Sequence, residues 1–149
     1  MKTLFQPIVA QSIKQRIESL RPTSQRQWGK MTVAQMMAHC SAALETAVGD
    51  SFPPRMFLGK LLGPLLKANL TNDKPFRKNT PTVKTFVFTD ERDFEAEKTK
   101  LLALIDRFVA GGEAGVTKHP HAFFGSLTPD EWSSGMYKHL DHHLRQFGV

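Results

Sequence analysis

The sequence has little of what marks secreted or membrane proteins. It contains one cysteine, Cys40, which excludes an internal disulfide and favours a reducing compartment, the cytoplasm. No run of 18 apolar residues is present, so a membrane span and a membrane partner are not expected. The N-terminus turns polar at Gln11 and charged by Lys14 without a small-residue cleavage site, which argues against a signal peptide. Without repeats or low-complexity tracts, a 149-residue chain that is 40% hydrophobic predicts a single domain over residues 1–149.

Acidic residues are nearly missing from one stretch. Between Arg55 and Lys84 there are seven basic residues and one acidic residue, Asp73, which accounts for the whole net charge of +6. Such a basic segment either attracts anionic ligands or is simply a solvated surface. Its charges are not interleaved with aromatic residues as in nucleic-acid-binding motifs, so nucleic acid is not expected as a partner.

Helix signals dominate the rest of the chain. Caps and apolar residues at helical spacing predict four helices, at about residues 6–20, 32–48, 90–110 and 128–149. Thr32 with Gln35, and Thr128 with Glu131, have the spacing of capping boxes. Gly49 is a natural end for the second helix.

A long connection, residues 50–89, separates the second and third predicted helices. It contains five prolines, and its stretch MFLGKLLGPLLKANL predicts one or two short helices. VKTFVF, at 83–88, alternates like an extended strand but has no evident partner. A connection of this length can cross the end of a bundle, so we expect an all-α four-helix bundle with a long crossover between helices 2 and 3.

Three of the six histidines fall between residues 139 and 143. At 100° per residue, His143 lies inside the apolar arc of the last helix and His139 at its border, whereas His142 and Asp141 lie outside. Two histidines at i and i+4 on one face can share a metal ion. A third ligand must come from elsewhere, and His39, at the border of the apolar face of the second helix, is the best candidate.

The alternative is that these histidines merely complete the edge of the core. His119 and His121 stand in a loop and are expected to make local hydrogen bonds or to lie at a rim. Cys40 lies about 100° around the helix from His39, so we interpret it as a small core residue and not as a ligand.

Three segments resemble a known family: QWGKMTVAQMMAHC, HPHAFFGSLTPDEW and MYKHLDHHLRQFGV. They are similar to the DUF1569 family of the DinB/YfiT-like superfamily of helical metalloproteins. The similarity extends from about Leu20 to Val149 and is weakest in the crossover. The resemblance implies a four-helix bundle with up-down-down-up topology. It also implies a three-histidine metal centre, whose ligands here would be His39, His139 and His143.

The resemblance implies chemistry of two kinds. Relatives include metal-dependent hydrolases and thiol S-transferases that use low-molecular-weight thiols. Three neutral imidazoles leave the charge of a divalent ion uncompensated and a coordination position open, which is typical of a catalytic site. We expect zinc or nickel, and a small-molecule substrate or a low-molecular-weight thiol. A non-enzymatic metal- or small-molecule-binding module, and action through a homodimer interface, remain as alternatives.

No general base is evident in the sequence. Residues on the faces of His39 and His139 are expected to line a pocket: Gln35, Thr46, Trp132, Gly135 and Met136. Gly135 in particular would leave room for a ligand. We also expect the basic crossover to lie over the end of the bundle nearer the metal, with one or two cations within about 10 Å of the pocket opening.

Overall fold

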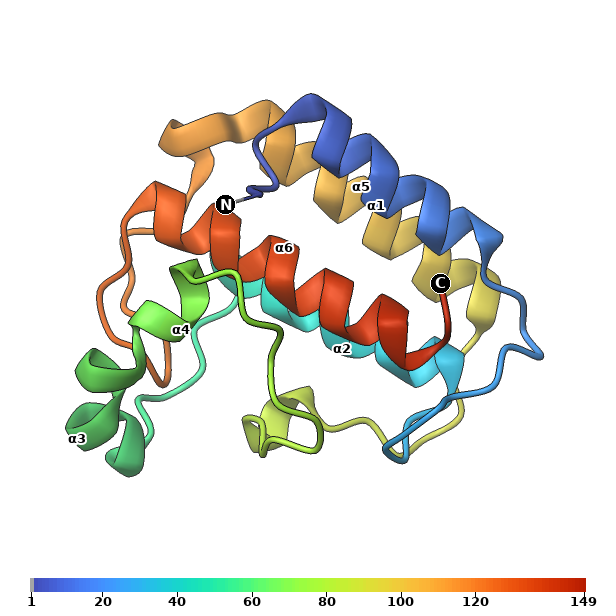
Figure 1. The fold of residues 1–149 in the computed structure, drawn as a ribbon, viewed down its shortest axis with the longest axis horizontal. Helices are drawn as coiled ribbons and strands as arrows, with labels where there is room; N and C mark the ends of the chain where they lie inside the picture. The colour runs from blue at the N-terminus through green and yellow to red at the C-terminus, as the bar shows by residue number, and fades with distance from the viewer. Residues whose placement is uncertain (1) are drawn as a thin grey trace.

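The computed structural model describes residues 2–149 and shows an all-helical chain (Figure 1). Within that range there is no β-strand, only one isolated bridge between His121 and Gly125. The α-helices are α1 (Pro7–Ser19), α2 (Val33–Ala47), α3 (Phe57–Leu66), α4 (Ala68–Thr71), α5 (Phe94–Gly111) and α6 (Pro129–Gln146). Two 3-10 helices, η1 (Lys84–Phe86) and η2 (Gly112–Gly115), complete the set. None of the helices in residues 2–149 has the length and apolar character needed to cross a membrane.

The four long helices share one hydrophobic core. α2 contacts α5 and α6, and α1 contacts the same two helices. Each contributes a side chain that is at most 1% exposed, such as Ile13, Leu44, Ile105 and Leu140. The apolar spacing that predicted these helices is therefore the pattern of residues that they bury.

Local capping fixes where the helices begin. Thr32 and Thr128 each form the predicted capping box, in which the threonine hydroxyl accepts from the N3 backbone N–H and the N3 side chain accepts in return. α5 begins four residues later than Asp90, the predicted start, because the side chain of Asp93 accepts the backbone N–H of Ala96 and caps it.

The crossover differs from the sequence prediction in one segment. Two short helices, α3 and α4, form where they were expected. The extended segment predicted at VKTFVF is wrong: Lys84–Phe86 make a 3-10 turn that packs against α2. A lone strand with no neighbouring strand has no ladder for its backbone N–H and C=O groups, so the turn satisfies some of them locally.

Helix α3 docks through its glycines. Gly59 and Gly63 lie so close to the backbone of Phe123 and Phe124 that a Cβ at either position would overlap it. This contact leaves the opposite face of α3 in solvent, including Phe57, which is 85% exposed.

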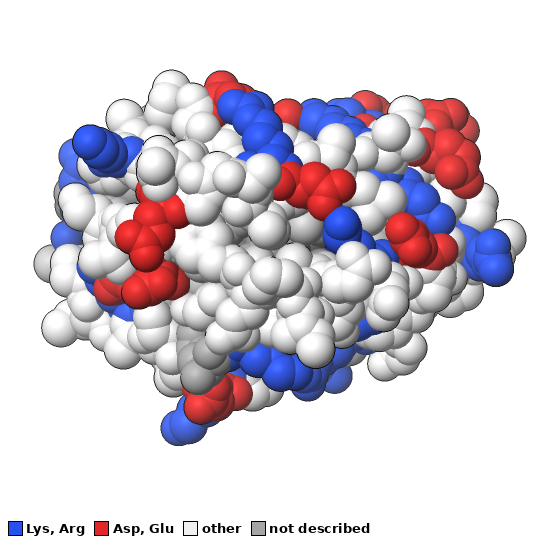
Figure 2. Space-filling view, turned by 90° about the horizontal axis from the view of Figure 1, so that it is seen from above, with Lys and Arg blue, Asp and Glu red and all other residues white. Residues whose placement is uncertain are grey.

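Charge is unevenly spread over the surface. Figure 2 looks onto the α1 and α5 side, where acidic and basic side chains are interspersed. Lys14 of α1 and Asp106 of α5 form one of the ion pairs there, at 2.6 Å. In the sequence the basic excess lies in the crossover, which Figure 1 shows on the side of α2 and α6 away from α1.

Candidate metal centre

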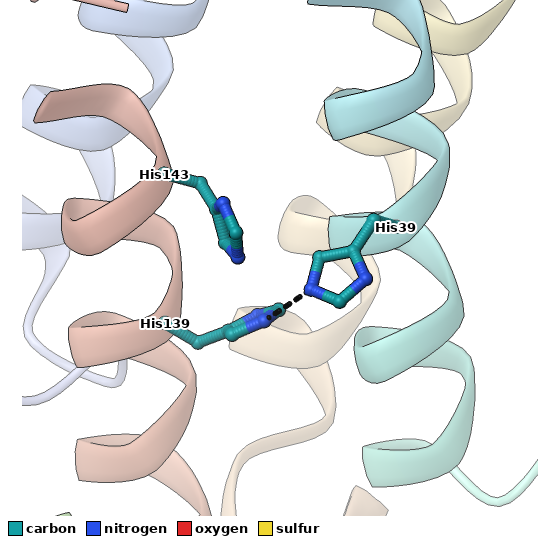
Figure 3. Close-up of side chains that lie close together, drawn as sticks. All are labelled: His39, His139 and His143. Carbon is teal, nitrogen blue, oxygen red and sulfur yellow. Dashed lines mark hydrogen bonds between the residues drawn. The ribbon is translucent and has the colours of Figure 1, made fainter. Parts of the chain in front are cut away.

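Three histidines converge between α2 and α6 (Figure 3). One nitrogen from each of His39, His139 and His143 lies within 4.8 Å of the others. His39 and His143 are buried, at 4% and 8% exposure, and His139 is half-buried. The structure thus brings together the three histidines that the sequence singled out, one from α2 and two from successive turns of α6.

The ring of His39 is held by the crossover. Its Nδ1 lies 2.9 Å from the backbone oxygen of Phe86 in η1, and the Phe86 ring packs edge-on against it. A carbonyl oxygen can only accept, so Nδ1 carries the proton of the neutral imidazole. The lone pair of His39 is therefore on Nε2, which faces the cluster.

Two consecutive hydrogen bonds orient the ring of His143, one within α6 and one from α6 to the loop at Trp28. Its Nδ1 lies 2.9 Å from Oε1 of Gln146, whose Nε2 donates to the backbone oxygen of Trp28 at 2.7 Å. That second bond fixes the orientation of the amide, so Oε1 accepts from His143. The lone pair of His143 is consequently on Nε2 as well.

His139 completes the cluster with one nitrogen lacking a partner. Its Nε2 lies 2.8 Å from Nε2 of His39, while its buried Nδ1 has no hydrogen-bond partner among residues 2–149. His39 Nε2 has no proton to donate, so its contact with His139 is a hydrogen bond only if His139 Nε2 carries the proton. The Nε2 lone pairs of His39 and His143 both point to that position. A cation would instead accept all three lone pairs. Tetrahedral zinc sites place imidazole nitrogens roughly 3.3 Å apart, which lies between the 2.8 Å of the His39–His139 contact and the 4.8 Å within which all three nitrogens fall.

Burial keeps the three rings uncharged. Desolvation lowers the pKa of His39, and the pKa of His143 falls to about 3, mainly by desolvation and then through the neighbouring His39. The pKa of His139 lies well below its ordinary value for the same first reason. At neutral pH all three are therefore neutral imidazoles, the form that binds metal.

The other α6 residues divide as the helical wheel suggested, with one exception. His142 stays outside the cluster and lies near Trp28 and Phe76, with ring centroids 5.7 and 6.2 Å away. Asp141 does not face solvent: its side chain is 14% exposed and accepts from Arg16 of α1 and from Arg145, each at 2.8 Å.

Two predictions about other residues are confirmed. His121 makes local hydrogen bonds: its Nδ1 accepts the backbone N–H groups of Phe123 and Phe124. Burial, and then Arg55, lower the pKa of His121 to about 4. Cys40 is a buried core residue, and desolvation raises the pKa of its thiol far above the ordinary value.

The five residues proposed to line a pocket have other contacts. Gln35 serves the α2 cap and donates to the backbone oxygen of Asp90. Thr46 donates to the backbone oxygen of Ala42, while Trp132 and Met136 are part of the core. The space beside Gly135 is filled by Leu70 of α4, 3.2 Å from where a Cβ would stand. A lining role for these five residues stays a prediction.

Two crossover cations approach the α6 side of the cluster. Lys74 and Lys78 line a cavity of about 680 Å³ together with His142. His142 in turn lies against His143, with ring centroids 5.0 Å apart. The expected separation of about 10 Å between such a cation and a pocket opening at the triad stays a prediction.

Sequence reasoning missed the residues that orient the histidines. Gln146 was within reach of prediction, because it stands three residues after His143 and shares its helix face. Phe86 of η1 and Trp28 of a loop act through their backbone oxygens, so their side chains give no signal in the sequence.

A buried histidine triad shared by two helices defines a candidate metal centre in an all-helical protein. The chain belongs to the DUF1569 family, described as proteins of unknown function, whose model matches residues 9–148. No curated protein and no solved structure matches the chain.

Proposed function

We propose that the protein is a metal-dependent enzyme that acts on a small molecule and holds zinc or nickel through His39, His139 and His143. The observation that carries this proposal is the convergence of three neutral imidazoles, two of which have Nδ1 occupied and Nε2 directed at the cluster. Outer hydrogen bonds of this kind orient metal-binding histidines in known sites.

The ligand set favours catalysis over a structural role. No carboxylate or thiolate belongs to the cluster among residues 2–149, so the ligands leave the charge of the ion uncompensated. When bound, such an ion acts as a Lewis acid and lowers the pKa of a water or a thiol. The chain itself supplies the orientation of the rings, through Phe86 and Gln146, and the burial that keeps them neutral.

Two enzyme classes fit this centre, a hydrolase and a thiol S-transferase. Cys40 cannot supply the thiolate for a transferase, because it is buried, donates to Met36 Sδ and has a strongly raised pKa. A transferase would therefore take a low-molecular-weight thiol from solution. The alternative is a helical module that binds metal or a small molecule without catalysis.

Thiol dependence separates these possibilities. Metal-loaded protein is incubated with a panel of electrophiles and esters, with and without glutathione or bacillithiol. Turnover only with thiol selects the transferase, and turnover by water alone selects the hydrolase. No turnover above that of a His143→Ala control under either condition favours the binding module.

We also propose that the four long helices form a bundle with up-down-down-up topology. In Figure 1, α1 and α6 run in one direction while α2 and α5 run in the other, and the crossover joins α2 to α5. This order supports the topology that the family resemblance implies. It places His39 and the α6 pair on neighbouring helices of opposite direction.

A further inference from the structure

A cavity lies beside α6, on the side of the helix that carries His142. It measures about 680 Å³, a volume suited to a small organic ligand. Its wall combines the loop at Trp28, the crossover at Phe76 and the α6 residues around His142. Neither capping nor core packing accounts for this combination of flat rings and charges.

The cavity carries an excess of positive charge. Five cationic side chains line it, against the carboxylates of Asp73 and Asp141. Asp141 is already shared between two arginines. Lys138 donates to oxygens of Asn69 and Asn72, and the carboxylate of Asp73 also acts on its charge. An anion in the cavity would meet Lys74 and Lys78, which are exposed and form no ion pair within residues 2–149.

Flat rings stand beside these cations. The Lys78 ammonium lies 4.1 Å from the centroid of the Trp28 ring, and Lys138 lies 4.8 Å from that of Phe76. The imidazole of His142 is near both aromatic rings. A planar ligand can stack on such faces while its charged group reaches a lysine.

The cavity also touches the groups that hold the metal centre. His142 is adjacent to His143 in the chain and in space, with ring centroids 5.0 Å apart. Trp28, which supplies a ring to the cavity, also accepts from Gln146 through its backbone oxygen. None of the three histidines lines the cavity, so a molecule in it would reach the triad past the ring of His142.

We propose that this cavity binds the substrate, and that the substrate is a small organic anion with a flat ring. Its carboxylate or sulfonate pairs with Lys74 and Lys78, and its ring packs against Trp28 and His142. This inference rests on the proposed function, because it names the substrate class of that enzyme. Binding in the cavity itself does not need the metal, so the two proposals are tested separately.

Calorimetric titration with a matched pair of probes tests the inference. Naphthalene-2-sulfonate carries the ring and the charge, and naphthalene-2-sulfonamide carries the ring alone. Both are titrated into metal-free and zinc-loaded full-length protein, and zinc content is measured on the same samples. The variants are Lys74→Ala/Lys78→Ala, the ring variant Trp28→Leu, and Lys60→Ala/Lys118→Ala. The last removes the same charge from exposed positions outside the cavity.

We expect saturable binding of one sulfonate per chain, at least about tenfold tighter than the sulfonamide, in both metal states. The double substitution Lys74→Ala/Lys78→Ala should weaken sulfonate binding about tenfold. The control Lys60→Ala/Lys118→Ala should change it by no more than about twofold. Trp28→Leu should weaken both probes. Equal binding of the two probes, an equal loss in the control, or no saturable binding overturns the inference. Zinc uptake without sulfonate binding rejects this proposal alone, whereas sulfonate binding without zinc uptake rejects only the metal centre.

Discussion

At the scale of single residues, the candidate centre depends on which ring nitrogen of each histidine carries the proton and which carries the lone pair. Phe86 and Gln146 accept hydrogen bonds from the Nδ1–H groups of His39 and His143, which leaves the lone pairs of both rings on Nε2. The helical wheel selected the three histidines that converge in the structure, because facing depends only on helix geometry. It could not select Phe86, because the path of the crossover is set by long-range packing.

Gln146→Leu tests the orienting role of the amide. The substitution keeps a buried side chain of similar size but removes the acceptor for His143 Nδ1, so the ring is free to rotate or change tautomer. We expect zinc affinity to fall by about 10- to 100-fold while the helical circular dichroism is kept. Gln25→Leu is the control, since Gln25 is exposed and bonds only the backbone of Thr23. Affinity unchanged from that of the control would show that Gln146 does not position the ring.

The buried histidines also predict acid sensitivity. His121 and His143 have folded-state pKa values of about 4 and about 3, lowered mainly by burial from 6.5. The unfolded chain therefore binds more protons below pH 6.5, so stability is fully present above that pH and is lost as pH falls toward 3. Each histidine contributes a slope of up to about 1.4 kcal/mol per pH unit.

Urea unfolding of metal-free protein between pH 8 and pH 4 measures this slope. We expect a plateau above about pH 6.5 and a decline below it. His143→Gln, which cannot titrate, should flatten part of the decline. A stability that is level down to pH 4 would contradict the neutral, buried state of these rings.

At the scale of elements, the sequence was sufficient to predict features that depend on residues close together in the chain. Both capping boxes formed as predicted, because each joins residues three apart. The start of α5 was misplaced by four residues, since several acidic residues compete for one cap. VKTFVF formed a turn because an extended segment is stable as a strand only beside a second strand, and the sequence does not show whether one lies nearby.

Thr128→Ala tests the cap that begins α6. It removes the hydroxyl that accepts the backbone N–H of Glu131, while the backbone N–H of residue 128 keeps the Glu131 carboxylate as its acceptor. We expect a loss of about 1 kcal/mol in the free energy of unfolding by urea. Thr99→Ala, at an exposed position inside α5, should be neutral or slightly stabilising. Equal effects of the two substitutions would contradict the capping role.

Gly63→Ala tests how α3 is attached. The added methyl group would overlap the backbone carbonyl of Phe123, which cannot move aside as a flexible side chain would. We expect the free energy of unfolding to fall by about 1–3 kcal/mol and the melting temperature by several degrees, with zinc affinity unchanged. Gly115→Ala is the matched control, because a Cβ there meets open space. A thermal shift no larger than that of the control would show that α3 is not held by this contact.

At the scale of the whole molecule, the crossover contains the basic segment and also contacts the candidate centre. It leaves α2, places Lys74 and Lys78 at the cavity beside α6, and then brings Phe86 against His39. The all-α fold and the histidine set could be predicted, since periodicity and helix facing encode both. The cavity could not, because its wall joins Trp28, Phe76 and α6 from three distant parts of the chain.

The central claim is that this chain holds one metal ion through His39, His139 and His143. Elemental analysis of tag-free protein equilibrated with micromolar zinc or nickel, then freed of excess metal, tests it most directly. We expect close to one ion per chain in the unsubstituted protein and in His142→Ala, and loss of most of the metal in His143→Ala. Retention well below one ion per chain without saturable uptake, or equal losses in the two variants, would contradict the account.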